Sequence, residues 1–210
     1  MNQKGFTLVE LIISIILISA IIIPAFSIAL SYKNKMLISS DKQQLLAYKN
    51  RLTVLIQSDI LTNGLKSVDW VAETAVDGTE VKSGKDNCNE NGKCVIKLDF
   101  KKAGSSPRYL IVRPELKRIS YVSSIDFTSD SLFAGTSPSF DEVLPVAYAD
   151  ILTYGEVNDS FARTYIDKAS SGGAAANSYA TIFIPIKYVD DTNDDETLDY
   201  GIHIVAELNP

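Results

Sequence analysis

The sequence has few of the side chains that metal enzymes and nucleophilic enzymes use. Its single histidine, His203, lies between Ile202 and Ile204 in a stretch that predicts a strand, and only two cysteines are present. One histidine cannot form a metal-binding histidine cluster, and two cysteines supply too few ligands for a zinc site. The sequence contains no phosphate-binding P-loop and no dinucleotide-binding glycine motif, and no nucleophile motif lies near His203. We therefore predict that the protein is not an enzyme and that His203 has a structural or surface role.

The chain also lacks an excess of positive charge. It has 20 Lys and Arg residues against 26 Asp and Glu residues, which gives a formal net charge of -6 at pH 7. This balance does not favour a general attraction to nucleic acid or to anionic lipid headgroups. A local basic and aromatic surface that contacts DNA is the alternative, and its residues would be Lys101, Lys102, Arg108, Arg113, Lys117 and Arg118 with Tyr109 and Tyr121. We expect instead a solvated sheet face with paired charges, and nucleic acid is not expected as a partner.

Charged residues are absent from the stretch between Leu11 and Leu30. Twenty residues form a helix of roughly 30 Å, which matches the hydrocarbon core of a bilayer. A cleaved secretory signal has a shorter apolar region followed by a small-residue cleavage site, whereas this run continues directly into a helical pattern. The sequence therefore predicts a single membrane-spanning helix that persists in the mature protein.

Pro24 lies inside this apolar run. It removes one backbone hydrogen bond and crowds the carbonyl of Ala20, so we predict a kink or a local loosening of the helix. The loosening could serve assembly, or Pro24 could be a kink that the membrane tolerates.

A short motif stands directly before the apolar run and consists of Lys4, Gly5, Phe6, Thr7, Leu8, Val9 and Glu10. It resembles the prepilin-peptidase recognition sequence of type IV pilins, pseudopilins and their relatives. The resemblance covers residues 1 to 31, and about residues 32 to 62 by pattern only. It implies cleavage after Gly5 on the cytoplasmic face, followed by N-methylation of Phe6. Gly5 suits a cleavage site because its missing side chain lets a protease approach an extended backbone.

Glu10 places an ionisable group at the edge of an otherwise apolar span. Such a group costs several kcal/mol at bilayer depth unless it is paired or reaches the interface. The resemblance implies that Glu10 pairs with the N-terminal ammonium of Phe6 in a neighbouring subunit. In a low local dielectric this pair would set the axial register of a filament more than it would add stability. The alternative is a glutamate that only reaches the lipid headgroups.

The pattern after Ser31 predicts that the helix continues in amphipathic form. Apolar residues recur at steps of three and four, namely Leu37, Ile38, Leu45, Tyr48, Leu52, Leu55, Ile56 and Ile60. Asn63 and Gly64 supply a stop signal. The predicted fold is α+β, a long N-terminal helix packed on an antiparallel β-sheet domain. Its parts are a cleaved leader at 1–5, a transmembrane and assembly helix at 6–31, an amphipathic helical half at 32–64 and a β-rich head at 65–210.

Two groups of strands are expected in the head. The first is an antiparallel meander that covers the apolar side of the helix, with strands at Val95–Phe100, Tyr109–Arg113 and Leu116–Val122. The second consists of two late strands around an acidic turn, Tyr179–Val189 and Tyr200–Leu208. Between the groups the patterns are weaker, and we expect a strand or helix at Val143–Tyr154, a short helix at Ser160–Ala169 and a loop at Ser171–Asn177.

The two cysteines, Cys88 and Cys94, flank a turn-prone stretch from Asn89 to Gly92. This arrangement predicts a hairpin disulfide outside the cytoplasm. Because the loop is short, the disulfide would contribute only roughly 2 to 3 kcal/mol. The alternative is two reduced thiols.

Acidic side chains concentrate in the loop from Asp190 to Glu196. Asp191, Asn193 and Asp195 have the alternate spacing that calcium favours, although the glycine and the distal glutamate of an EF-hand are absent. Some pseudopilins, which the N-terminal motif resembles, bind calcium in a late loop. The alternative is a solvated acidic hairpin tip, and no other cofactor is expected.

The resemblance implies a structural role. We predict a subunit of a type IV pilus filament. We expect a minor subunit instead of the main one, because the long irregular region from Asp130 to Gly173 does not suit a simple repeated coat protein. The expected partners are other pilins, prepilin peptidase, a membrane platform protein and an assembly ATPase. The expected location is the cytoplasmic (inner) membrane, followed by an extracellular pilus or a pseudopilus in the cell envelope. The alternatives are a type II secretion or competence pseudopilin, or an adhesive or DNA-binding module mounted on a filament.

Overall fold

The computed structural model describes residues 8–74, 80–82, 94–127, 129, 132–133, 135–152, 165–170, 178–188 and 201–208. The chain divides into two compact units, Met1–Gln43 and Gln44–Pro210. One long helix, α1 (Leu8–Asn63, 56 residues), contributes to both units and continues through Pro24. The predicted long N-terminal helix is confirmed, and the predicted kink at Pro24 stays a prediction.

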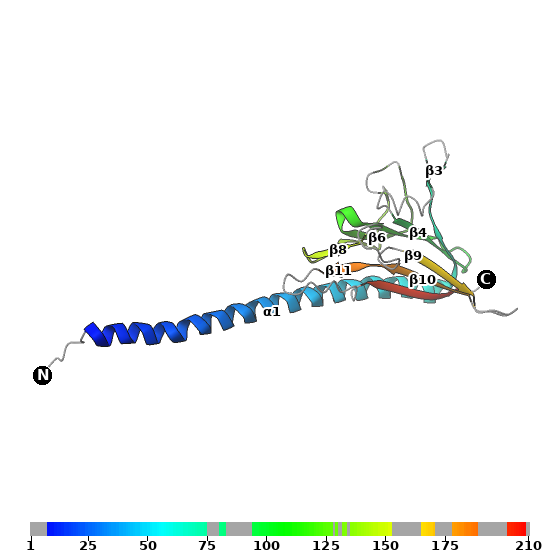
Figure 1. Cartoon of the computed structure of the whole chain (residues 1–210). Coiled ribbons are helices and arrows are strands. Elements are labelled where there is room, and N and C mark those ends of the chain that lie inside the picture. Colours follow the sequence, from blue (N-terminus) through cyan, green and yellow to red (C-terminus); the bar gives the residue numbers. More distant parts are fainter. Residues whose placement is uncertain are drawn as a thin grey trace. The chain divides into compact units, whose positions relative to one another are not determined.

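The second unit is built around a five-stranded antiparallel sheet in the order β1-β4-β5-β6-β7. Figure 1 labels two of these strands, β4 and β6. The strands are β1 (Leu65–Trp70), β4 (Cys94–Phe100), β5 (Arg108–Arg113), β6 (Arg118–Val122) and β7 (Phe140–Val143). The expected meander corresponds to β4, β5 and β6. The third strand was predicted to start at Leu116, which is wrong because the 3-10 helix η1 (Pro114–Leu116) occupies that position and Lys117 adopts a positive φ of 50°.

One face of the sheet packs against the second half of α1. The buried helical residues are Leu45, Tyr48, Leu52 and Ile56, which recur at the predicted three- and four-residue steps. On the sheet, directly opposite residues share a face, so Ile96, Leu110 and Tyr121 lie together on the helix side. The ring of Tyr48 meets the ring of Phe140 edge-on, with 5.2 Å between centroids. This layer is the main core of the unit.

The other face of the five-stranded sheet is covered by irregular chain. Val95, Ile111 and Val122 form a buried cluster with Leu132 from the segment after β6. Val71, Tyr109, Ile125, Phe127 and Phe133 pack around this cluster. The segment turns back on itself through a hydrogen bond from the Asp126 amide to the Leu132 carbonyl at 2.8 Å. Part of the irregular middle region therefore acts as a cover that buries the second side of the sheet.

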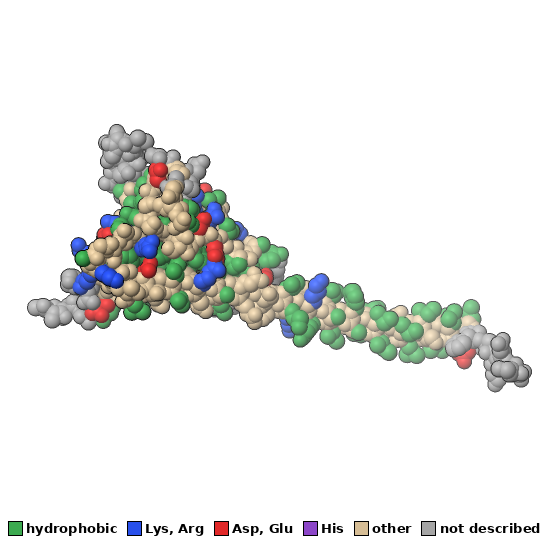
Figure 2. Space-filling view, turned by 180° about the vertical axis from the view of Figure 1, so that it is seen from behind, with side chains coloured by type: hydrophobic (Ala, Val, Ile, Leu, Met, Phe, Trp, Pro, Cys, Tyr) green, Lys and Arg blue, Asp and Glu red, His purple; other side chains and the backbone are tan. Residues whose placement is uncertain are grey.

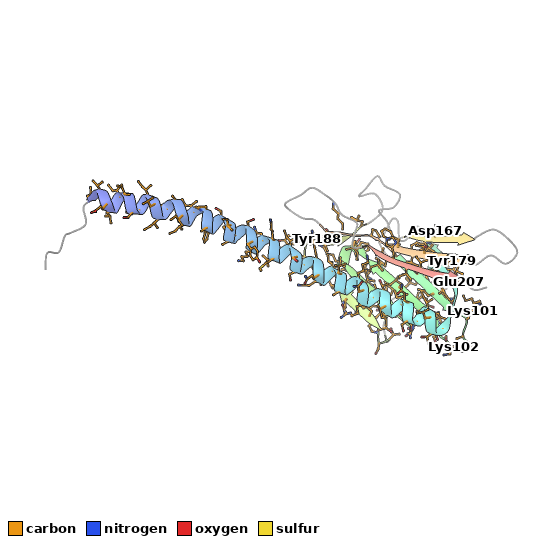
Figure 3. The ribbon with its side chains drawn as sticks, turned by 90° about the horizontal axis from the view of Figure 1, so that it is seen from below. Lys101, Lys102, Asp167, Tyr179, Tyr188 and Glu207 are labelled. Atoms are coloured by element: carbon orange, nitrogen blue, oxygen red, sulfur yellow. The ribbon has the colours of Figure 1, made fainter. Side chains whose placement is uncertain are left out.

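The C-terminal end of α1 is closed by the loop between β4 and β5. Gly64 has a positive φ of 66°, which favours glycine, and its amide donates to the Ile60 carbonyl at 2.8 Å. The amides of Lys101 and Lys102, labelled in Figure 3, donate to the carbonyls of Gly64 and Asn63 at 2.9 and 3.1 Å. The predicted stop at Asn63 and Gly64 is confirmed.

The late strands form two smaller sheets. β12 (Ile202–Leu208), β10 (Ser178–Ile184) and β9 (Tyr165–Ser170) make a three-stranded antiparallel sheet in that order. β8 (Ala149–Ile151) pairs with β11 (Ile186–Tyr188), and a short pair joins β2 (Glu73–Thr74) to β3 (Glu80–Lys82). The single strand predicted at Tyr179–Val189 is divided at the buried Pro185, which has no amide hydrogen for a ladder.

The short helix predicted at Ser160–Ala169 is wrong for residues 165–169. They belong to β9, where Ile166 lies opposite Ile182 and Tyr165 lies opposite Phe183. Pairing with β10 therefore overrides the weak local preference. The stretch predicted as strand or helix at Val143–Tyr154 contains the strand β8, and the predicted loop at Ser171–Asn177 lies outside the described residues.

Leu52 and Val54 are a matched pair of substitution sites on α1, because Leu52 is 0% exposed and Val54 is 63% exposed. Leu52→Ala should lower the free energy of unfolding by about 2 to 5 kcal/mol, since it leaves a cavity in the core. Val54→Ala should change it by less than about 0.5 kcal/mol. Denaturant unfolding of the full chain in detergent, followed by near-ultraviolet circular dichroism, measures both values. Equal losses would contradict the described packing of the helix on the sheet.

Candidate functional site

The predicted assembly site lies at the start of α1. Gly5 and Phe6 lie outside the described residues, and Glu10 lies exposed in the first turn of the helix. A carboxylate in the first turn interacts favourably with the partial positive charge of the helix N-terminus. The backbone carbonyl of Glu10 accepts a hydrogen bond from the Ser14 hydroxyl at 2.7 Å. The site therefore presents its one acidic side chain within an ordered helical turn.

The first unit exposes an almost continuous apolar surface. No described residue between Leu8 and Gln43 is buried, and the large apolar side chains from Leu8 to Leu30 are 47% to 75% exposed. Figure 2 shows hydrophobic side chains along this part of the chain. The helix is long and apolar enough to cross a membrane by length and composition. Lipid or other apolar helices can cover such a surface, whereas its exposure to water is unfavourable.

The hydroxyl groups of this apolar stretch are satisfied within the helix. Ser14, Ser19 and Ser27 each donate a hydrogen bond to the carbonyl four residues earlier, at 2.7, 2.8 and 3.0 Å. An unsatisfied hydroxyl would be costly in hydrocarbon, and this pattern removes that cost. The three serines are therefore compatible with a membrane-embedded helix.

Comparison with protein families agrees with this location. Residues 1–26 match the model of the prokaryotic N-terminal methylation motif. The chain carries the prepilin-type motif of type IV pilins and pseudopilins. No curated protein and no solved structure matches the chain. The prepilin-type motif and the apolar helix together fit a protein anchored in the inner membrane.

Downstream of the prepilin-type motif, Asp59 of α1 makes polar contacts with Tyr121 and Arg108 of the sheet, which we call the Asp59 clamp. The Tyr121 hydroxyl donates to the Asp59 carboxylate at 3.0 Å, and the Arg108 guanidinium lies 3.4 Å from the same oxygen. Burial, followed by the negative charge of Asp59, raises the pKa of Tyr121 far above its usual range. Tyr121 is therefore a neutral hydrogen-bond donor at every physiological pH.

A second set of contacts, which we call the Glu142 clamp, joins Tyr48 and Arg51 of α1 to Glu142 of β7. The Tyr48 hydroxyl donates to the Glu142 backbone carbonyl at 3.1 Å, and Arg51 forms an ion pair with the Glu142 side chain. The Arg51 guanidinium also lies over the Phe140 ring, 5.1 Å from its centroid. Burial raises the pKa of Tyr48 well above its usual range. Sequence patterns did not identify either clamp, because each joins residues far apart in the chain.

Three basic residues of the alternative basic and aromatic surface lie in ion pairs. Arg108 pairs with Asp59 on the helix side of the sheet, whereas Arg118 pairs with Asp141 at 2.9 Å on the opposite side. Lys117 lies 2.6 Å from Asp150 and also donates to the Ala147 carbonyl at 3.0 Å. Tyr121 is 0% exposed. These three residues are therefore paired with carboxylates, and the DNA-binding surface stays an untested alternative.

The remaining candidate residues have no shared site among the described residues. Cys94 is buried at the start of β4, while Cys88 and the calcium candidates Asp191, Asn193 and Asp195 lie outside the described residues, so the disulfide and the calcium site stay predictions. The described part of the chain contains no group of three or more His, Cys, Asp or Glu residues placed to hold a metal ion.

His203 lies exposed on β12, and the centroids of the His203 and Phe183 rings are 4.3 Å apart. Partial burial, followed by the positive charge of Lys49, lowers the pKa of His203. A neutral imidazole resting on an aromatic ring is consistent with the structural or surface role that the sequence predicts.

Two arginines placed within the apolar run test the membrane anchor. Ile18→Arg with Ile22→Arg adds charge at the centre of the span, where each arginine costs about 2.5 to 3.5 kcal/mol of insertion free energy. The double variant should lose most of its carbonate-resistant membrane fraction, measured by sedimentation and immunoblot. Val54→Arg with Ser58→Arg has the same spacing on an exposed part of the same helix and should leave that fraction unchanged. Equal membrane retention of both variants would exclude this segment as the anchor.

Proposed function

We propose that the chain is a structural subunit, and a minor one, of a type IV pilus filament, assembled through its N-terminal helix. The observation that carries the proposal is the continuity of two features at one end of the chain. A prepilin-type motif at residues 1–26 leads directly into a helix whose large apolar side chains are exposed from Leu8 to Leu30. A processed N-terminus joined to an uncovered apolar helix is what a subunit needs to enter a filament from a membrane.

Processing by prepilin peptidase is the first step of the proposed mechanism. The peptidase cuts the bond after Gly5 on the cytoplasmic side, and the amino group of Phe6 becomes the new N-terminus and is methylated. The cleavage removes Lys4 and creates one cationic amine at the edge of the apolar run. That amine lies four residues before Glu10 in the chain, which is about one helical turn.

Assembly is the second step. The Glu10 carboxylate of one subunit pairs with the Phe6 amine of a neighbouring subunit as the apolar helices exchange lipid contacts for contacts with each other. Helices in lipid associate through close packing and polar contacts, because lipid chains are as apolar as the side chains. A charge pair in this low dielectric is sensitive to geometry, so it fixes the register of adjoining helices. A platform protein and an assembly ATPase would drive the step.

The minor role is supported by the form of the head. The sheet carries an irregular cover after β6 and a separate three-stranded sheet formed by β9, β10 and β12. Such additions give the head a surface of its own, which suits a subunit with a particular place in a filament better than a repeated coat.

Gly5→Ala tests the processing step. The added methyl group obstructs the extended backbone at the cleavage site, so the variant should keep Met1 to residue 5, whereas the wild type should begin with N-methylated Phe6. Intact-mass measurement of each protein purified from membranes of cells with a prepilin peptidase distinguishes these forms. Asp41→Asn serves as the control and should be cleaved normally. Normal cleavage of the Gly5→Ala chain would argue against the proposed processing.

Glu10→Gln tests the register pair separately from cleavage. The amide keeps the size of the side chain but removes its charge, so the new N-terminal amine loses its counter-charge. The variant should be processed normally, and its amount in sheared filaments should fall roughly tenfold or more, since each 1.4 kcal/mol changes an equilibrium tenfold. Quantitative immunoblots of filament and membrane fractions measure the ratio. Undiminished incorporation would remove Glu10 from the mechanism.

A further inference from the structure

The three-stranded sheet presents one exposed face that combines apolar and acidic side chains. Val205 of β12 lies opposite Thr181 of β10, which lies opposite Asp167 of β9. In the next row, Glu207 lies opposite Tyr179. Directly opposite residues in an antiparallel sheet share a face, so these five side chains form one surface, which we call the acidic face. Figure 3 labels Asp167, Tyr179 and Glu207 on their three strands.

The orientation of this face is fixed by the core beneath it. The alternate residues Ile182, Ile204 and Ala206 are buried at 1%, 1% and 7% exposure. A slip by one residue would expose them, so the register holds the acidic face outward. Val205 is nevertheless 58% exposed and Tyr179 is 40% exposed, next to the exposed carboxylates of Asp167 and Glu207. Outward apolar groups beside charges of one sign are typical of a surface that receives a partner.

A lysine of α1 lies near the His203 end of this face. Lys49 of α1 is close enough to His203 to lower its pKa, after the larger effect of partial burial. The five residues of the acidic face include two carboxylates and no lysine or arginine. A partner that matches this face would combine exposed apolar side chains with positive charge.

The chain itself contains a helical segment with that composition. The basic stretch, residues 32–37 of α1, carries Lys33 and Lys35, and the chain has no Asp or Glu between Glu10 and Asp41. Tyr32, Lys35 and Met36 lie at positions i, i+3 and i+4, so they share one side of the helix. Tyr32 is 62% exposed and Met36 is 57% exposed. The basic stretch begins two residues after the apolar run ends at Leu30, so it lies outside the lipid-spanning residues.

We propose that the acidic face of one copy binds the basic stretch of α1 in a second copy. Tyr179 and Val205 would pack on Tyr32 and Met36, while Glu207 and Asp167 attract Lys35. The two surfaces differ, so the contact is head-to-tail and can repeat from copy to copy. This inference rests on the proposed function, because it names one contact between adjacent subunits. It does not involve Glu10 or the N-terminal amine.

Site-specific photo-crosslinking tests the contact on the full chain in lipid vesicles. A benzoylphenylalanine at position 36 should give a crosslinked dimer on illumination, and mass spectrometry of the digested dimer should place the link on β10 or β12 near Tyr179 and Val205. High salt should reduce the yield, because exposed charges are screened within about 3 Å at 1 M salt. Links confined to residues 8–30, or links that map to the other side of the head, would overturn the proposal.

Exchanging the charges of Glu207 and Lys35 tests whether these two residues attract each other across the contact. Glu207→Lys should lower the dimer yield by about threefold to tenfold, because one attraction becomes a repulsion of similar size. Lys35→Glu in the same chain should restore the yield, since every head-to-tail contact then has opposite charges again. Glu115→Lys, an exposed carboxylate outside the acidic face, should have no effect. Failure of the double variant to recover, or equal loss with Glu115→Lys, would overturn the proposal.

The two proposals can fail separately. If Gly5→Ala and Glu10→Gln act as expected while the charge exchange has no effect, the filament role stands and the acidic face has no part in it. If the mature protein keeps Met1 while the position-36 crosslink still maps to the acidic face, the contact stands and the filament role does not.

Discussion

The large apolar side chains of α1 from Leu11 to Leu30 are exposed, and their exposure to water is unfavourable. The three serines in the stretch satisfy their hydroxyl groups inside the helix. Lipid or other apolar helices are the two environments that can cover such a surface. A prepilin-type motif lies at the start of this helix.

The second half of the same helix is attached to the folded head. Its four buried residues repeat on one side, and two polar clamps at Asp59 and Glu142 add direction to the apolar contact. Apolar packing tolerates small rotations, whereas a tyrosine hydroxyl bonded at 3.0 Å does not. One helix thus combines an exposed apolar half with a half that packs on the sheet.

Sequence patterns predicted the parts of this structure that depend on neighbouring residues. Helical periodicity from Leu37 to Ile60, the stop at Gly64 and the alternation in β4 are local features, and the prepilin-type motif is local too. The patterns failed for β9, because its strand conformation comes from pairing with β10. They also missed the cover around Leu132 and the clamp at Asp59, since Asp59 and Tyr121 are 62 positions apart. The sequence alone does not show which distant residues meet.

The loop that closes the end of α1 has a mechanical consequence. The amides of Lys101 and Lys102 bind the last turn of the helix, Asp59 is held one turn earlier, and Tyr48 is held three turns before that. A pull along this part of the helix would be shared by these three attachments. Twisting the helix would likewise carry the sheet with it. Between Tyr48 and Gly64 the helix is therefore attached to the sheet along its length, without a hinge in that range.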